Sequence, residues 1–292
     1  MSARRIYVGR RFVLGEFRCS PDDELWRQEN VIGPPGVSVA TFPITSVVIR
    51  HEGQDAFLAN PNHVVFYRRG ERYRRALHDE RGDACLFVDF DARTAAELGG
   101  VEGELPIAYG PSDARAYLRL RLAARAARAG AGEALAIEEA VSVALSSAFE
   151  AGLAVHRVRH VARSATAAEH ARLVESAKQV LMERATERDS LSSIAAMLHV
   201  SEFHLARTFR AQTGFTLHAY RTHLRLRSAL DRLARSDGLL TKLAVELGFN
   251  SHSHLAVAFR SVFGASPSEI RASYGRRRLA ELPGTLAAPV RS

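Results

Sequence analysis

The chain has 292 residues, 47% of them hydrophobic, which allows two globular domains and excludes a largely disordered chain. Lys and Arg outnumber Asp and Glu by 40 to 32, so we expect attraction to a polyanion or an acidic surface. The two cysteines, Cys19 and Cys85, are too few for a disulfide framework, and no apolar run reaches the roughly 20 residues of a membrane span. Without a signal-peptide pattern either, we expect a cytoplasmic protein that does not enter the membrane.

Residues 1 to about 110 have the pattern of β structure. Short apolar runs such as TSVVIRHEG (45–53), HVVFYRRGERY (63–73) and CLFVDF (85–90) are separated by turns rich in Gly, Pro, Asn and Asp. Strands at short intervals, with no helical pattern between them, predict a β-sandwich or barrel.

The aromatic side chains of this region have two possible roles. They can line a ligand pocket, with an arginine meeting an acidic group, or they can fill the interior of a small barrel. The candidate effector-binding residues are Trp26, Phe42, Phe66, Tyr67, Arg68 and Tyr73.

Neither metal chemistry nor catalysis is expected from the residue patterns. His51, His63 and His78 lack the close spacing of a metal site, and His252 and His254 do not face one another on a helix. No nucleophile, base and orienting group stand together, so we expect no enzyme activity and no cofactor. Cys85 fits a buried strand residue better than a sensing thiol.

Two helices follow, from about residue 112 to 129 and from about 133 to 151. In the second, Ile137, Val141 and Leu145 form an apolar stripe that must face its own domain or a second copy of the chain. We expect residues 111–165 to be a helical dimerisation element and linker, with the basic segment 156–170 as the linker, and we expect a homodimer.

The C-terminal region, residues 166–275, contains a helical repeat. Apolar residues spaced i, i+3, i+4 and i+7 form one helix face in each copy, and the second copy begins 49 positions after the first. A tight turn follows each set, one residue longer in the second copy, and a second apolar set then recurs. The repeated residues are Leu191, Ile194, Ala195, Leu198, Leu205, Phe209 and Gly214, and then Leu240, Leu243, Ala244, Leu247, Leu255, Phe259 and Gly264.

Each copy predicts a helix-turn-helix unit, because its second helix is held by few apolar residues and leaves one face free. Ser201 and Ser251 are placed to cap these second helices. Such a helix can enter the major groove of double-stranded DNA. The free faces of the copies differ, so each is expected to read different bases.

The expected contacts follow from side-chain chemistry. Arg207 can bind guanine, Phe203 and Val257 can touch thymine methyl groups, and Arg210 and Arg260 are placed for phosphates. The candidate DNA-binding residues are Ser201, Phe203, His204, Ala206, Arg207, Arg210, Ser251, His252, Ser253, Ala256, Val257 and Arg260. Between the copies, residues 216–235 predict one continuous helix of about 28 Å, with Thr216 as its cap.

Residues 173–274 resemble the C-terminal DNA-binding domain of the AraC family of bacterial transcription regulators. The motifs are SIAAMLHVSEFHLARTFRAQTG and the ending GFNSHSHLAVAFRSVFGASPSEIR. The resemblance implies control of transcription initiation, often through contact with RNA polymerase. It also implies that residues 1–110 are a cupin-like domain that senses a small-molecule effector. Ala206 and Val257 depart from the family, in which a polar or basic base-reading residue is frequent at these places.

The expected fold is therefore α+β and multidomain. A cupin-like β-barrel or sandwich (1–110) is followed by the helical connector (111–165), an all-α domain with two helix-turn-helix units (166–275) and a basic, flexible tail (276–292). The main hypothesis is an effector-responsive regulator. A cupin-type enzyme or DNA-repair protein with the same module, and a constitutive DNA-binding protein whose barrel only dimerises, are the alternatives.

Overall fold

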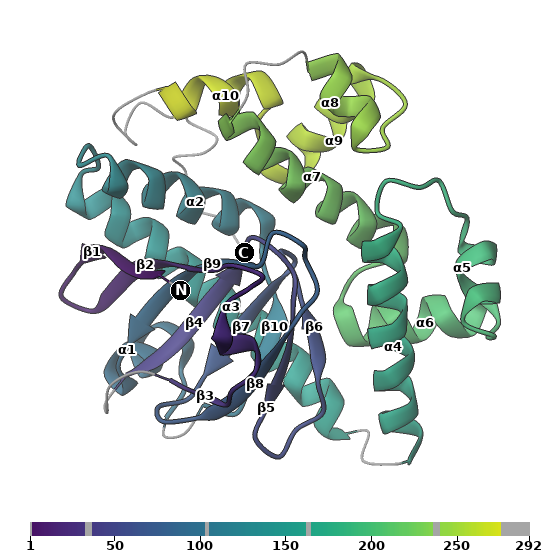
Figure 1. The fold of residues 1–292 in the computed structure, drawn as a ribbon, viewed down its shortest axis with the longest axis horizontal. Helices are drawn as coiled ribbons and strands as arrows, with labels where there is room; N and C mark the ends of the chain where they lie inside the picture. Colours follow the sequence, from purple (N-terminus) through teal and green to yellow (C-terminus); the bar gives the residue numbers. More distant parts are fainter. Residues whose placement is uncertain (1, 33–36, 103–104, 162–164, 236–239, 276–292) are drawn as a thin grey trace. The chain divides into compact units, whose positions relative to one another are not determined.

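A computed structural model describes residues 2–32, 37–102, 105–161, 165–235 and 240–275 (Figure 1). The chain forms two compact units, one built mainly from residues 1–153 and the other from residues 154–272. The basic tail, 276–292, lies outside the described residues.

The first unit is a sandwich of two antiparallel sheets. The larger sheet has the order β1-β2-β9-β4-β7-β10 and the smaller has the order β3-β8-β5-β6. The strands of the larger sheet are β1 (Ser2–Val8), β2 (Phe12–Cys19), β9 (Asp83–Phe90), β4 (Ser38–Pro43), β7 (His63–Tyr67) and β10 (Tyr109–Pro111). Those of the smaller sheet are β3 (Asn30–Val31), β8 (Arg72–Leu77), β5 (Val47–His51) and β6 (Phe57–Ala59).

The two faces of the larger sheet are both buried, but against different partners. On one face, Phe66 and Phe90 pack on Phe149 of the long helix α3 (Ala134–Val161). On the other face, Val65 and Tyr67 join a cluster with residues of the smaller sheet. Successive residues of a strand point to opposite faces, which is why neighbours in β7 belong to different layers.

Three further helical segments belong to this unit. They are the short η1 (Glu24–Trp26), α1 (Ala92–Gly99) and α2 (Ala114–Arg128). Asp113 caps α2, since its side chain accepts a hydrogen bond from the Ala116 N–H.

The apolar stripe of α3 is covered by the chain itself. Ile137, Val141 and Leu145 are all buried within the single chain. Of the two partners that the sequence left open, its own domain or a second copy of the chain, the structure shows the first, because the stripe packs inside its own unit. The helix also continues to Val161 and α4 begins at Ala165, so the expected linker is helical over 156–161 and 165–170.

The second unit is entirely helical over its described residues. Its helices are α4 (Ala165–Glu183), α5 (Leu191–Met197), α6 (Glu202–Thr213), α7 (Leu217–Arg235), α8 (Leu240–Glu246), α9 (His252–Phe263) and α10 (Pro267–Gly275). An apolar cluster joins α4 to the first repeat and to the start of α7, with Val174, Leu205 and Leu224 among its buried members. The expected α+β class, with a two-sheet β region followed by a helical region, is confirmed.

Candidate nucleic-acid interface and ligand cavity

The repeat folds into two helix-turn-helix units, α5–α6 and α8–α9. In the first, Leu205 and Phe209 are fully buried and anchor α6. The Ser201 Oγ accepts a hydrogen bond from the His204 N–H (3.2 Å) and caps this helix. Gly214 ends it with φ 77°, in the left-handed region that glycine enters without strain.

The second unit repeats this construction. Leu255 and Phe259 are fully buried, and Gly264 ends α9 with φ 79°. The Ser251 Oγ accepts a hydrogen bond from the His254 N–H (3.1 Å). The helix, turn and cap predictions are confirmed for both copies, because each depends on local spacing.

The outward face of α6 combines an aromatic ring with two arginines. Phe203 is 75% exposed, and the Arg207 guanidinium lies 5.8 Å from the centre of its ring. Arg210 is exposed one turn further along. Ala206 is half-buried, and so is His204, whose ring lies 5.3 Å from that of His170 in α4.

The outward face of α9 is less basic. Val257 is 69% exposed, Ser253 is exposed, and His252 and Ala256 are half-buried. Arg260 is exposed and its Nη2 lies 3.4 Å from the Glu269 carboxylate of α10, a contact open to solvent. The two faces therefore differ in charge while sharing one backbone plan.

The turns of the two units share an unusual backbone conformation. His199 has φ 55°, and Gly248, which takes the equivalent place 49 positions later, has φ 76°. A Cβ at Gly248 would lie 2.3 Å from the Thr186 carbonyl oxygen, so the second turn has no room for a side chain. The first turn carries its histidine in the same left-handed region.

Helix α7 joins the two units without interruption, as the sequence predicted. The Thr216 Oγ1 accepts from the Ala219 N–H (3.1 Å) at its start. Leu217 and Tyr220 on one face of α7 are buried against the first helix-turn-helix unit. Further along, Leu226 and Leu230 are fully buried.

Arg225 of α7 binds three backbone carbonyl groups. Its guanidinium donates to Ala185, to Glu187 (2.6 Å) and to Gly248 (3.0 Å). Burial, with Arg221 and Arg188 nearby, lowers the pKa of Arg225 to about 10. The residue therefore links the loop before the first unit to the turn of the second.

A hollow of about 580 Å³ lies beside α6 and brings further basic side chains to its outward face. It is lined by Phe203, Arg207 and Arg210 together with His218 and Arg221 of α7. Burial lowers the pKa of His218, and Arg221 and Arg225 act in the same direction. The sequence reasoning missed His218 and Arg221 because it treated α7 only as a spacer.

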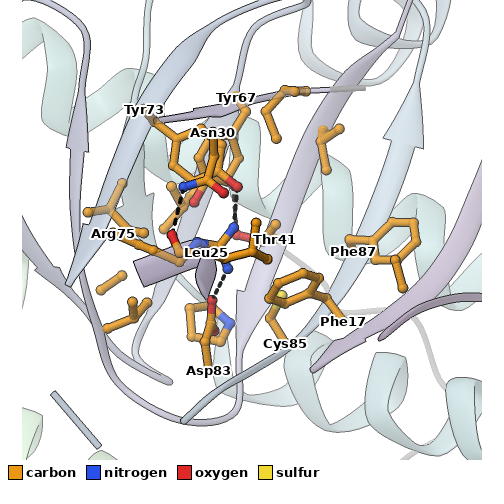
Figure 2. A pocket seen from close by; sticks show the side chains of 18 of the residues that line it. Phe17, Leu25, Asn30, Thr41, Tyr67, Tyr73, Arg75, Asp83, Cys85 and Phe87 are labelled. Carbon is orange, nitrogen blue, oxygen red and sulfur yellow. Dashed lines mark hydrogen bonds and ion pairs between the residues drawn. The ribbon is translucent and has the colours of Figure 1, made fainter. Parts of the chain in front are cut away.

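A second hollow, of about 540 Å³, lies between the two sheets of the first unit (Figure 2). Its walls are mostly apolar, from residues such as Val39, Ile49 and Val65. Tyr67 and Tyr73, two of the expected effector-binding residues, line it. The space between the sheets is thus a cavity. The sequence alone could not decide between such a cavity and a fully packed interior.

The other four expected pocket residues are placed elsewhere. Phe42 and Phe66 do not line this cavity, and Phe66 packs against Phe149 of α3 instead. Trp26 packs against the cluster around the cavity without lining it. Arg68 lies outside the cavity wall and pairs with Glu71 (3.2 Å).

Arg75 and Asp83 form the charged centre of the cavity wall, and the sequence reasoning missed both. Arg75 Nη1 donates to the Asp83 carboxylate (2.8 Å), and its Nη2 donates to the Tyr73 hydroxyl (Figure 2). The guanidinium also lies 4.6 Å from the centre of the Phe17 ring. Burial raises the pKa of Asp83, and the charge of Arg75 opposes this shift.

Cys85 also lines the cavity and is buried, as expected for a strand residue. Burial raises the pKa of its thiol well above the usual value, with the negative charge of Asp83 acting in the same direction. A raised pKa disfavours the reactive thiolate.

The described residues also bear on two other kinds of site. No helix there is long and apolar enough to cross a membrane. Within the same ranges, no group of three or more His, Cys, Asp or Glu side chains is arranged to hold a metal ion.

The helical region is similar to known proteins. A family described as a helix-turn-helix domain matches residues 194–273. The transcriptional activator RhaS of Escherichia fergusonii is 38% identical over 85 residues, which are 29% of this chain and 31% of RhaS. The transcriptional regulator MtrA of Neisseria gonorrhoeae is 25% identical over 99 residues, 34% of this chain and 33% of MtrA. The match thus spans about a third of these relatives.

Among solved structures, a transcriptional regulator of Chromobacterium violaceum, described as having an AraC-type DNA-binding domain, is similar to part of the chain. It is 26% identical with a TM-score of 0.35, and the similarity covers 37% of this chain and 97% of that one. The family match at 194–273 falls on the two helix-turn-helix units built by α5–α6 and α8–α9. Residues 194–273 are therefore a helix-turn-helix domain, and part of the chain is similar to the transcription regulators RhaS and MtrA.

Proposed function

We propose that this protein is a sequence-specific DNA-binding regulator of transcription. Each subunit would lay α6 and α9 in two adjacent major-groove segments. The observation that carries this proposal is the pair of helix-turn-helix units, whose buried frames match and whose exposed faces differ. Phe203 and Val257 are exposed on these two faces, where bound DNA would cover them.

The side chains divide into base readers and phosphate binders. Arg207 would bind guanine bidentately, and Phe203 and Val257 would contact thymine methyl groups. Arg210 and Arg260 would bind phosphates, and the hollow beside α6 adds His218 and Arg221 as further candidates.

The remaining candidates have smaller roles in this proposal. His252 and Ser253 would hydrogen-bond bases or phosphates, and Ser201 and Ser251 would orient their helices as caps. His204, Ala206 and Ala256 are half-buried and would let the helix backbones approach the groove.

A binding experiment on sequences selected from random duplex DNA tests this division. Arg207→Ala should weaken the preferred site by about 1–3 kcal/mol and relax one base position. Arg210→Ala should weaken preferred and poor sites alike and lower the salt slope by about one. Arg69→Ala, an exposed arginine of the first unit, is the matched control and should change neither. Equal losses at every site from both variants would contradict the assigned roles.

We also propose that the cavity of the first unit binds a small-molecule effector. Its volume of about 540 Å³ lies within the usual range of ligand pockets, roughly 300–1,000 Å³. Residues 1–110 and 111–165 would act as sensor and connector, and 166–275 as the DNA-binding domain. A homodimer, contact with RNA polymerase and a cytoplasmic location, where the DNA is accessible, belong to the same proposal.

A further inference from the structure

The carboxylate and guanidinium side chains that line the cavity are mainly acidic. They are Glu29, Arg75, Asp83 and Asp89, one cation against three carboxylates. The walls between them are mostly apolar or aromatic, so unbalanced charges there are weakly screened.

Two of the three carboxylates already have a cationic partner. Asp83 pairs with Arg75 (2.8 Å), and both side chains are buried. Glu29 pairs with Arg72 (2.7 Å), which is itself exposed and outside the cavity wall. These pairs leave no unpaired cation in the described part of the wall with which an acidic ligand could pair. An added carboxylate would also lie beside Asp83.

Asp89 differs from the other two. It forms no hydrogen bond or ion pair with any residue in the described ranges, and Arg5 of β1 acts on it only at longer distance. Burial raises the pKa of its carboxyl, because the surroundings disfavour the charged form, and Arg5 opposes the shift. A cation brought next to this carboxylate would relieve that cost.

The residues nearest to Asp89 in the wall favour the same kind of ligand. Phe87 lies two residues earlier on the same face of β9, and Val39 and Thr41 of β4 pair with Asp89 and Phe87 in register. Phe17 of β2 lines the cavity further along (Figure 2). Aromatic faces attract organic cations, and the aliphatic residues accept an apolar body.

We infer that the cavity selects a lipophilic organic cation, whose ammonium group pairs with Asp89 while its apolar body lies between the sheets. This inference rests on the proposed effector function and specifies its ligand. Arg75 and Asp83 then act as a closed, neutral pair that borders the site, where Arg75 also donates to the Tyr73 hydroxyl and Tyr67 lies in the same wall.

Calorimetric titration of the full chain with three probes of one shape tests the inference. Phenylpentylamine is cationic at neutral pH, phenylpentanol is neutral and phenylpentanoate is anionic. The amine should bind at least about tenfold more tightly than the alcohol, with the carboxylate weakest, a preference equivalent to about 1.4 kcal/mol.

Variants of Asp89 test whether its carboxylate causes the preference for the amine. Asp89→Asn should reduce the affinity for the amine to that for the alcohol and leave the alcohol unchanged. Asp89→Glu, which keeps the charge, should keep the order of the probes. Glu52→Gln removes an exposed carboxylate outside the cavity wall and should have no effect. If the Asn variant does not fold, the order of the probes on the native chain and on the Glu variant decides.

Four results would overturn the inference: equal affinity for all three probes, tightest binding of the carboxylate, no binding of any probe, or amine binding that is unchanged in Asp89→Asn. DNA binding by the same protein without ligand is measured separately. Specific DNA binding without cation selectivity defeats only this inference, whereas cation binding without specific DNA binding defeats the proposed function.

Discussion

The Arg225 guanidinium donates a hydrogen bond to the Gly248 carbonyl oxygen (3.0 Å), and this contact ties the connecting helix to the turn of the second helix-turn-helix unit. The same guanidinium binds the Ala185 and Glu187 carbonyl groups in the loop before the first unit. One side chain thus binds both the loop before the first helix-turn-helix unit and the turn of the second, so we expect it to fix the spacing between their exposed helices.

Replacing Arg225 tests this role. Arg225→Lys keeps the charge but cannot present the planar fork that binds three carbonyl groups, so it should lower the free energy of unfolding by about 2–4 kcal/mol. Chemical denaturation followed by circular dichroism measures the loss. Arg232→Lys, in an exposed ion pair on the same helix, should change stability by no more than about 0.5 kcal/mol. Equal small effects of the two variants would remove Arg225 from this role.

The turns at His199 and Gly248 should respond in opposite ways to a change of side chain. Gly248→Ala puts a Cβ against the Thr186 carbonyl oxygen in a left-handed backbone, so we expect a loss of about 2 kcal/mol or more. His199→Gly removes a side chain from the same conformation and should be neutral or stabilising by up to about 1 kcal/mol. Urea denaturation of both variants compares them. A stable Gly248→Ala protein would show that the turn conformation is not required.

Glu71 of the first unit should contribute to acid unfolding. Burial acts to raise the pKa of Glu71, but hydrogen bonds from His51 and the Arg68 N–H outweigh it and hold that pKa below the usual value. A carboxylate with a lowered folded-state pKa contributes stability above its unfolded pKa, near 4.3, and loses it as the pH falls through the lower folded value.

The matched variants are therefore Glu71→Gln and Glu80→Gln, the latter at an exposed position in the same unit. Unfolding free energies measured from neutral pH to about pH 3 should fall less steeply in Glu71→Gln than in the native chain. Glu80→Gln should follow the native curve. Parallel curves for all three proteins would show that Glu71 carries no such stability.

Helix α4 should be required for the DNA-binding unit to fold alone. Val174, Ala177 and Leu181 of α4 are buried in the cluster that includes Leu205 and Leu224. A fragment of residues 154–292 should therefore be helical, show a cooperative thermal transition and bind a selected DNA site. A fragment of residues 186–292 should melt without cooperativity. Cooperative unfolding of the shorter fragment would place the core elsewhere.

The helical repeat could be predicted in detail because its signals are local. Apolar spacing, the Ser201 and Ser251 caps and the Gly214 stop each depend on neighbours within one or two turns of helix. The hydrogen bonds of Arg225 could not be predicted, because its carbonyl partners lie 23 to 40 positions away in the sequence.

The cavity was harder to predict for a different reason. Every residue of β7 is buried, so the strand has no polar face to show that Tyr67 faces the cavity while Phe66 faces α3. The Ile137 stripe presented a similar ambiguity, since an apolar helix face looks the same whether its own domain or a partner covers it.

The spacing of α6 and α9, the two helices that we propose to read DNA, tests the central claim most directly. Helix α7, Leu217–Arg235, has 19 residues and spans about 28 Å, close to the roughly 34 Å between successive major-groove openings on one face of DNA.

The decisive measurement is the affinity and footprint of the protein on its selected site before and after about five base pairs are inserted between the two segments. The insertion turns one segment to the opposite face of the duplex, about half a helical turn away. A stiff connector predicts that one segment loses its footprint and that affinity falls to that of a single segment. Tight binding with both footprints intact would contradict the account, because α7 could not then set the spacing.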